Sequence, residues 1–104
     1  MEKSLDTGIT QEAKDKIIGI IHALIPHCKI YLFGSRARGT HAVSSDVDLA
    51  LDTGTAIEPR RKVGEVQEVL KGLYTPYTIE VVDFHSVTDT MQHLILQEGI
   101  PWSR

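Results

Sequence analysis

The stretch KIYLFGSRARGTHAVSSDVDLALD, residues 29–52, indicates the fold of this chain more strongly than any other part of the sequence. Its two ends, 29–33 and 46–52, are short and rich in apolar residues, and each has the length and composition of a buried strand. A glycine and a serine end the first run. A polar connection, whose first turn we expect to be helical, separates it from the second. The stretch therefore predicts two strands of one small sheet.

Helical patterns flank this stretch on both sides. Upstream, apolar residues from Ile17 to Leu24 recur at helical spacing behind a capping threonine, Thr10. Downstream, Ser86 is expected to cap the last helix, with Asp89 in the capping-box position. The expected elements outside the stretch are a helix over 11–25, a helix over 59–73, a strand over 78–84 and a helix that ends near 98. This order predicts an α/β fold in which helices cover a small sheet.

Length and composition indicate one compact domain. The chain has 104 residues, of which 41% are hydrophobic and 24% are charged, and these values are typical of a globular domain with a modest core. We expect the domain to span residues 1–104, with residues 1–9 as a loose polar tail. The net charge of −3 disfavours a protein that coats nucleic acid, because no overall positive field is available to hold a polyanion.

Membrane and secreted classes are also disfavoured. No apolar run approaches the ~20 residues of a membrane span, and the N-terminus carries no apolar signal segment. Cys28 is the only cysteine, which excludes an internal disulfide and a cysteine-based zinc site and fits a reducing compartment. The sequence therefore predicts a cytoplasmic protein.

Two aspartates and a glycine–serine pair are the residues most suited to chemistry. Asp46 and Asp48 are two residues apart on an expected strand, so both carboxylates are predicted to lie on one face. Two ionised carboxylates repel each other unless a cation lies between them, and Mg²⁺ is typically held by carboxylates together with substrate phosphates. Gly34 allows the backbone to approach a ligand closely, and the Ser35 hydroxyl can bind a phosphate.

A third carboxylate would complete a two-metal site, in which the ions lie roughly 3.5–4 Å apart. The third expected strand offers Glu80 and Asp83, which are three residues apart and face opposite sides of a regular strand. Only one of them can join the two aspartates, and the spacing leaves open which one does. Arg36 and Arg38 flank the expected phosphate site, and each is either a phosphate ligand or a surface charge.

The pair Gly34-Ser35, a ten-residue gap and then Asp46-x-Asp48 together resemble the signature of polymerase-β-type nucleotidyltransferases, and the short chain resembles the minimal nucleotidyltransferases within that superfamily. The resemblance covers most of the chain. It implies a nucleotidyltransferase fold with a mixed sheet, and transfer of AMP from ATP to a hydroxyl with release of pyrophosphate. It also implies that Gly34 and Ser35 contact the nucleotide phosphates. Two Mg²⁺ ions would be held by Asp46, Asp48 and Glu80, where Glu80 takes the place that Asp usually holds.

The same resemblance implies a protein partner. Minimal nucleotidyltransferases are often paired with a helical HEPN-type toxin, and some act as its antitoxin by adenylylating a tyrosine on it. A small domain without an acceptor-binding domain needs another protein to supply the acceptor hydroxyl. Two alternatives stay open: a non-catalytic module that neutralises a HEPN-type partner by complex formation, and a nucleotide sensor without turnover. An oligomer is compatible with the sequence.

Overall fold

The computed structural model describes residues 7–102, so the part of the expected tail over residues 1–6 lies outside the described residues. The elements, in chain order, are α1 (Gln11–Leu24), β1 (Lys29–Phe33), α2 (Ser35–Arg38), β2 (Val47–Asp52), α3 (Arg61–Lys71), β3 (Ile79–Asp83), the 3-10 helix η1 (Phe84–Ser86), α4 (Asp89–Glu98) and β4 (Ile100–Pro101). Their order confirms the expected α/β fold.

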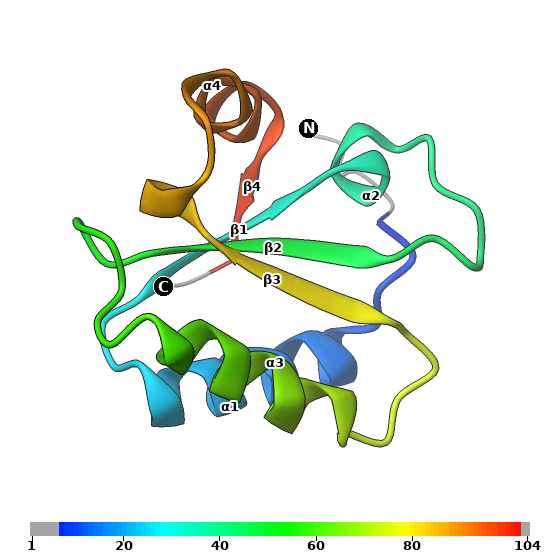
Figure 1. Cartoon of the computed structure of the whole chain (residues 1–104). Helices are drawn as coiled ribbons and strands as arrows, with labels where there is room; N and C mark the ends of the chain where they lie inside the picture. The colour runs from blue at the N-terminus through cyan, green and yellow to red at the C-terminus, as the bar shows by residue number, and fades with distance from the viewer. Residues whose placement is uncertain (1–6, 103–104) are drawn as a thin grey trace.

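Within the described residues, four strands form one mixed sheet in the order β3-β2-β1-β4 (Figure 1). β1 pairs antiparallel with both β2 and β4, and β2 pairs parallel with β3. A parallel pair needs a crossover connection, and here α3 provides it. β3 is an edge strand, and Gln67 of α3 covers its outer edge. The Gln67 side chain donates to the Ile79 carbonyl at 2.7 Å and accepts from the Val81 amide at 2.9 Å.

Helices cover both faces of the sheet. α1 and α3 lie side by side on one face, and α4 lies on the other (Figure 1). Strand alternation sends Leu32 and Leu49 into the first layer, where they belong to one buried cluster with Ile17 and Val66. The buried residues of the smaller layer, on the α4 side, are Phe33, Ala50, Phe84 and Ile95. In residues 7–102, no helix is long and apolar enough to cross a membrane.

The segment before α1 is held in place, which corrects the expectation of a loose tail for residues 7–9. The Thr7 carbonyl accepts a hydrogen bond from Arg36 at 2.7 Å, and the Gly8 carbonyl accepts one from the Tyr77 hydroxyl at 2.9 Å. Ile9 packs against the core. The polar composition was misleading because the segment is held mainly through backbone carbonyls, which every sequence offers.

The helix caps confirm one expectation and correct another. Thr10 caps α1, since its hydroxyl accepts a hydrogen bond from the Ala13 amide at 3.2 Å. α4 is capped by Thr88, whose hydroxyl accepts from the Met91 amide at 3.2 Å, and not by Ser86. The Ser86 hydroxyl instead donates to the buried carboxylate that ends β3. The first turn of the expected helix is therefore the separate element η1.

Other differences lie at the ends of elements. α3 begins at Arg61, two residues after the expected start, and Pro59 lies before it behind a cis peptide bond. β4 was not predicted, because two residues are too few to show a periodic pattern. Ile100 of β4 pairs with Leu32, so the end of the chain extends the sheet beyond β1.

Candidate active site

Two carboxylates lie next to each other on β2 and β3. Asp48 and Glu80 are direct partners in the parallel register. Both lie on the sheet face opposite α1 and α3, because the neighbours of Asp48, Val47 and Leu49, point into the layer beneath those helices. Asp46 is exposed and lies one residue before β2, whereas the sequence analysis expected it within the strand. The site therefore begins at the entry to β2 and continues across to β3.

The electrostatics of Asp48 show that these carboxylates share one negative field. Burial raises the pKa of Asp48, and the charges of Asp46 and then Glu80 raise it further. The charge of Arg38 has a smaller, opposite effect. Since the effect of Arg38 is smaller than that of either carboxylate, the nearby positive charge does not compensate the negative charges of Asp46 and Glu80. Carboxylates with unbalanced charge of this kind are characteristic of functional sites.

Asp83, the other candidate for the third carboxylate, lies on the opposite face. It is buried, and its oxygens accept hydrogen bonds from the Ile57 amide at 2.9 Å, the His85 amide at 3.1 Å and the Ser86 hydroxyl at 2.8 Å. These bonds tie the loop before α3 and the start of η1 to the end of β3. The geometry thus brings Glu80, and not Asp83, next to the aspartates of β2.

Gly34 brings the backbone close to this group. It has a positive φ of 82°, and a Cβ atom at this position would lie 2.5 Å from Oδ2 of Asp48. A larger residue would therefore meet both backbone strain and a direct clash with the carboxylate. Ser35 follows as the first residue of α2 and is half-buried. The glycine–serine pair and the carboxylates consequently lie within one small region.

The two arginines of α2 differ in their surroundings. Arg36 is 2% exposed, and all three of its guanidinium nitrogens donate to backbone carbonyls, those of residues 7, 43 and 45. The direct phosphate contact that the sequence analysis considered for Arg36 is therefore not the arrangement found, because the guanidinium is already engaged. Arg38 remains accessible, with 43% of its side chain exposed, and pairs with Glu98 of α4 at 3.0 Å.

The carboxylates suit a hard divalent cation that is shared with a substrate. Among residues 7–102, no three His, Cys, Asp or Glu side chains are arranged to hold a metal ion by themselves. Mg²⁺ does not require such a cage, because one or two carboxylates hold it together with substrate phosphates and water. The unbalanced negative charge at Asp48 and its oxygen donors fit that mode of binding.

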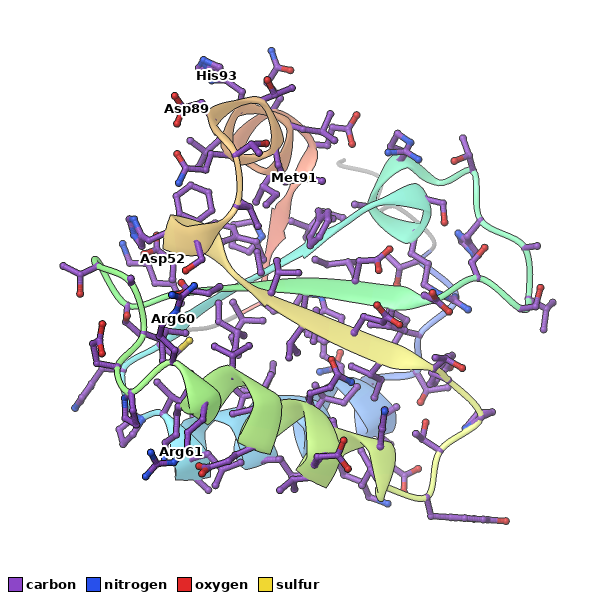
Figure 2. All side chains as sticks on the ribbon, viewed as in Figure 1. Asp52, Arg60, Arg61, Asp89, Met91 and His93 are labelled. Atoms are coloured by element: carbon purple, nitrogen blue, oxygen red, sulfur yellow. The ribbon has the colours of Figure 1, made fainter. Side chains whose placement is uncertain are left out.

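The far end of β2 carries a contrasting carboxylate. Asp52, on the same face as Asp48, pairs with the His85 ring at 2.7 Å and accepts from the Gly54 amide at 2.8 Å. Figure 2 shows Asp52 at the end of the sheet nearest η1, on the side where α4 carries Met91 toward the sheet and His93 away from it. Its bond to the Gly54 amide gives Asp52 a role in the turn that follows β2.

Sequence reasoning missed two residues that act around the site. Glu98 pairs with Arg38 across sixty positions of the chain, and no local pattern predicts that contact. Tyr77 lies beneath Arg36, with the guanidinium carbon 5.3 Å from the ring centroid. Its position just before a strand and after a proline, Pro76, was the only available signal.

Comparison with known proteins shows the family to which this chain belongs. The sequence matches the family described as polymerase beta, nucleotidyltransferase, over residues 15–101, which is most of the chain. Among curated protein sequences, none matches this chain. A solved toxin–antitoxin structure with AMP-PNP has a TM-score of 0.73 and 25% identity, over 86% of this chain and 72% of that chain.

Two further solved structures share the fold. A complex of a tri-AMPylated Shewanella oneidensis HEPN toxin with an MNT antitoxin has a TM-score of 0.62 at 20% identity, over 91% of this chain and 72% of that chain. A protein assigned to the minimal nucleotidyltransferases has a TM-score of 0.68 at 20% identity, over 96% of this chain and 99% of that chain. The chain belongs to the polymerase beta nucleotidyltransferase family.

Proposed function

We propose that this protein transfers AMP from ATP to a hydroxyl of a protein partner, and that the acceptor is a tyrosine of a HEPN-type toxin that the transfer inactivates. The observation that carries the proposal is the group of carboxylates, Asp46, Asp48 and Glu80, next to Gly34-Ser35. The proposal includes a cytoplasmic location, since ATP is supplied there and a single free cysteine fits a reducing compartment.

In this proposal each residue has a distinct task. Asp46, Asp48 and Glu80 hold two Mg²⁺ ions, which when bound supply positive charge to the triphosphate and to the leaving pyrophosphate. Gly34 lets the backbone approach the phosphates, and the Ser35 hydroxyl donates to a phosphate oxygen. Arg38 contributes its exposed guanidinium from the same side.

The reaction itself is an exchange of one phosphorus–oxygen bond for another. The acceptor oxygen forms a bond to the α-phosphorus of ATP, the bond from that phosphorus to the bridging β-phosphate oxygen breaks, and pyrophosphate leaves. The acceptor hydroxyl loses its proton to solvent or to a nearby carboxylate. The protein contributes orientation and charge stabilisation rather than covalent chemistry.

The partner is supported by two considerations. Solved structures similar to this chain are a toxin–antitoxin complex with AMP-PNP and a complex that contains an AMPylated HEPN toxin. The described residues form one small sheet with its covering helices and contain no separate acceptor-binding domain, which fits an acceptor supplied by a partner. A helical HEPN-type protein encoded beside this chain is the expected source.

The test is incubation of the purified protein with ATP labelled at the α-phosphate, Mg²⁺ and the HEPN-type protein from the adjacent reading frame. We expect label on the partner, on a tyrosine located by peptide mass spectrometry, and loss of that label in Asp48→Asn. If the partner stays unlabelled with the wild-type protein and still binds it, the enzyme proposal is wrong.

A second candidate function is neutralisation of the toxin by complex formation alone. Glu80 favours it, because glutamate is one methylene longer than the aspartate usual at this position and displaces a metal ligand by roughly 1 Å, while Mg²⁺ requires near-ideal octahedral geometry. Under this alternative Asp46→Asn neutralises the toxin as well as the wild type. Under the enzyme proposal, the same variant binds the toxin and leaves it active.

A further inference from the structure

Arg36 connects several chain segments that surround the carboxylates. Its Nη1 donates to the Thr7 carbonyl at 2.7 Å, and its Nη2 donates to the Val43 carbonyl at 3.1 Å. Its Nε and Nη2 both donate to the Ser45 carbonyl, at 3.1 and 3.0 Å. The guanidinium also lies over the ring of Tyr77. One side chain of α2 therefore contacts the N-terminal segment, the loop before β2 and the loop before β3.

The free-energy cost of burying the Arg36 guanidinium indicates that it does more than fill space. Arg36 is 2% exposed, and the hydrogen-bond acceptors around it are backbone carbonyls, with no ion pair to a carboxylate among the described residues. Burial of a charge without an opposite charge is unfavourable, and an apolar side chain of similar volume often fills such a space at least as stably. What an apolar residue cannot do is fix three carbonyls at set positions.

The carbonyl that receives most hydrogen bonds from Arg36 is that of Ser45. Ser45 precedes Asp46, and two guanidinium nitrogens bind its carbonyl oxygen. Ser45 also closes a turn with Ala42. The Ser45 amide donates a hydrogen bond to the Ala42 carbonyl at 3.0 Å, and the Ser45 hydroxyl accepts one from the Ala42 amide at 2.8 Å. The middle of this loop contributes little packing, since Val43 is 97% exposed. The loop thus depends on Arg36 for its position.

The same guanidinium reaches toward the second carboxylate strand. Tyr77, which it covers, lies two residues before β3, and the Val47 amide donates to the Thr78 carbonyl at 2.8 Å. β3 then carries Glu80 opposite Asp48. One buried arginine therefore contacts the residues that lead into both carboxylate-bearing strands, β2 and β3.

We infer that Arg36 is a positioning residue, which sets Asp46 relative to Asp48 and Glu80 and does not itself contact the nucleotide. The inference rests on the proposed nucleotide transfer and adds a residue to it. Lysine cannot replace Arg36 in this role, because a single ammonium group lacks the planar set of donors that reaches three separate carbonyls. Arg38, on the same helix, differs in being exposed and in pairing with a side chain, Glu98, rather than with backbone carbonyls.

The test compares three Arg-to-Lys variants, at Arg36, Arg38 and Arg61. Arg61 is an exposed residue of α3, on the side of that helix away from the sheet in Figure 2, and serves as the matched control with unchanged activity. For Arg36→Lys we expect kcat of transfer to fall about 100-fold, the loss typical of a misplacement near 1 Å, with KM for ATP changed less than about threefold. For Arg38→Lys we expect mainly a higher KM for ATP.

Two further measurements do not depend on turnover. Hydrogen exchange of the 43–46 amides should be faster in Arg36→Lys than in the wild type and unchanged in Arg61→Lys. The affinity for Mn²⁺, followed by its electron paramagnetic resonance signal, should fall about tenfold in Arg36→Lys.

Chemical rescue adds a test that uses turnover. Added guanidinium ion at millimolar concentration should restore part of the kcat of Arg36→Ala, and ammonium ion should not.

The outcomes separate this inference from the proposed function. If the wild type transfers no label, the proposed function fails, and hydrogen exchange and Mn²⁺ affinity still decide the role of Arg36. A rise in KM for ATP with unchanged kcat in Arg36→Lys would overturn the inference in favour of a nucleotide ligand. Unchanged exchange and unchanged Mn²⁺ affinity would overturn it outright. If Arg36→Lys does not fold, Tyr77→Leu, which removes the ring beneath the guanidinium, must show the same fall in kcat.

Discussion

The carboxylates at the two ends of one sheet face have different surroundings. Asp52, at the end near η1, pairs with the His85 ring and accepts from a turn amide. Asp48, four residues earlier on the same strand, has Asp46 and Glu80 as its main charged neighbours, and its pKa is raised. At the first end, hydrogen bonds within the fold satisfy the carboxylate and stabilise the turn after β2. The second leaves negative charge to be balanced by something that binds.

The largest expected effect comes from Asp48→Asn, which removes the charge at the unbalanced end. We expect transfer to the partner to fall about 1000-fold, since the variant loses the carboxylate that lies against Gly34. Stability to urea should not fall, because a repelled charge is removed. A large loss of stability with retained transfer would show that Asp48 stabilises the fold and does not serve the site.

Gly34→Ala is expected to have the next largest effect. The new Cβ must occupy space 2.5 Å from Oδ2 of Asp48, at a φ of 82°. Transfer should fall about 100-fold because the carboxylate is displaced, and stability should fall by about 1–2 kcal/mol because of backbone strain. Gly54→Ala, also at a positive φ but with open space around the new Cβ, is the control and should lower stability without lowering kcat.

Asp83→Ala probes a carboxylate on the opposite face, where three donors satisfy it. We expect the free energy of unfolding to fall by about 2–3 kcal/mol, because the Ile57 and His85 amides and the Ser86 hydroxyl lose their acceptor. The kcat of the remaining folded protein should stay within about threefold of wild type. Chemical denaturation and steady-state kinetics on the same preparation measure both quantities. A loss of kcat comparable to that of Asp48→Asn would mean that Asp83 belongs to the site.

The pH dependence of stability should differ between wild type and Asp48→Asn. Because the pKa of Asp48 is higher in the folded protein than in the unfolded chain, the folded state binds more protons in the window between the two values. This group therefore makes stability fall as pH rises from about 4 through its raised pKa. Urea unfolding at a series of pH values without divalent cations should show a steeper fall in wild type. Equal slopes in the two proteins would contradict the unbalanced charge at Asp48.

The smallest expected effect is that of Glu98→Gln, which releases Arg38 from its ion pair. The pair is partly exposed to solvent, so stability should change by less than about 1 kcal/mol. The freed guanidinium should lower KM for ATP slightly, by no more than about threefold. Binding of a fluorescent ATP analogue measures this directly. A clear rise in KM would show that Glu98 holds Arg38 in its working position.

Much of this arrangement could be predicted because it follows local patterns. Thr10 and the apolar face of α1 follow helical spacing, and the two-residue spacing of Asp46 and Asp48 placed them at one strand. The choice of Glu80 over Asp83 came from the family resemblance. Strand alternation shows that the two residues face opposite sides, but it does not show which side carries Asp48. Pairing in register with β2 decides that, and register is a property of the folded sheet.

The role of Arg36 was out of reach for a different reason. Its acceptors are carbonyls, which carry no sequence signature, and they come from segments that only the folded chain brings together. The cap at Thr88 was missed because Ser86 offered an equally good local signal, and the buried carboxylate of Asp83 takes the Ser86 hydroxyl.

The most direct test of the central claim is anomalous diffraction from crystals grown with Mn²⁺ and a non-hydrolysable ATP analogue. We expect manganese peaks within ligand distance of the carboxylates of Asp46, Asp48 and Glu80, with the triphosphate beside Gly34-Ser35. Nucleotide bound elsewhere, or these carboxylates turned apart with no manganese between them, would contradict it.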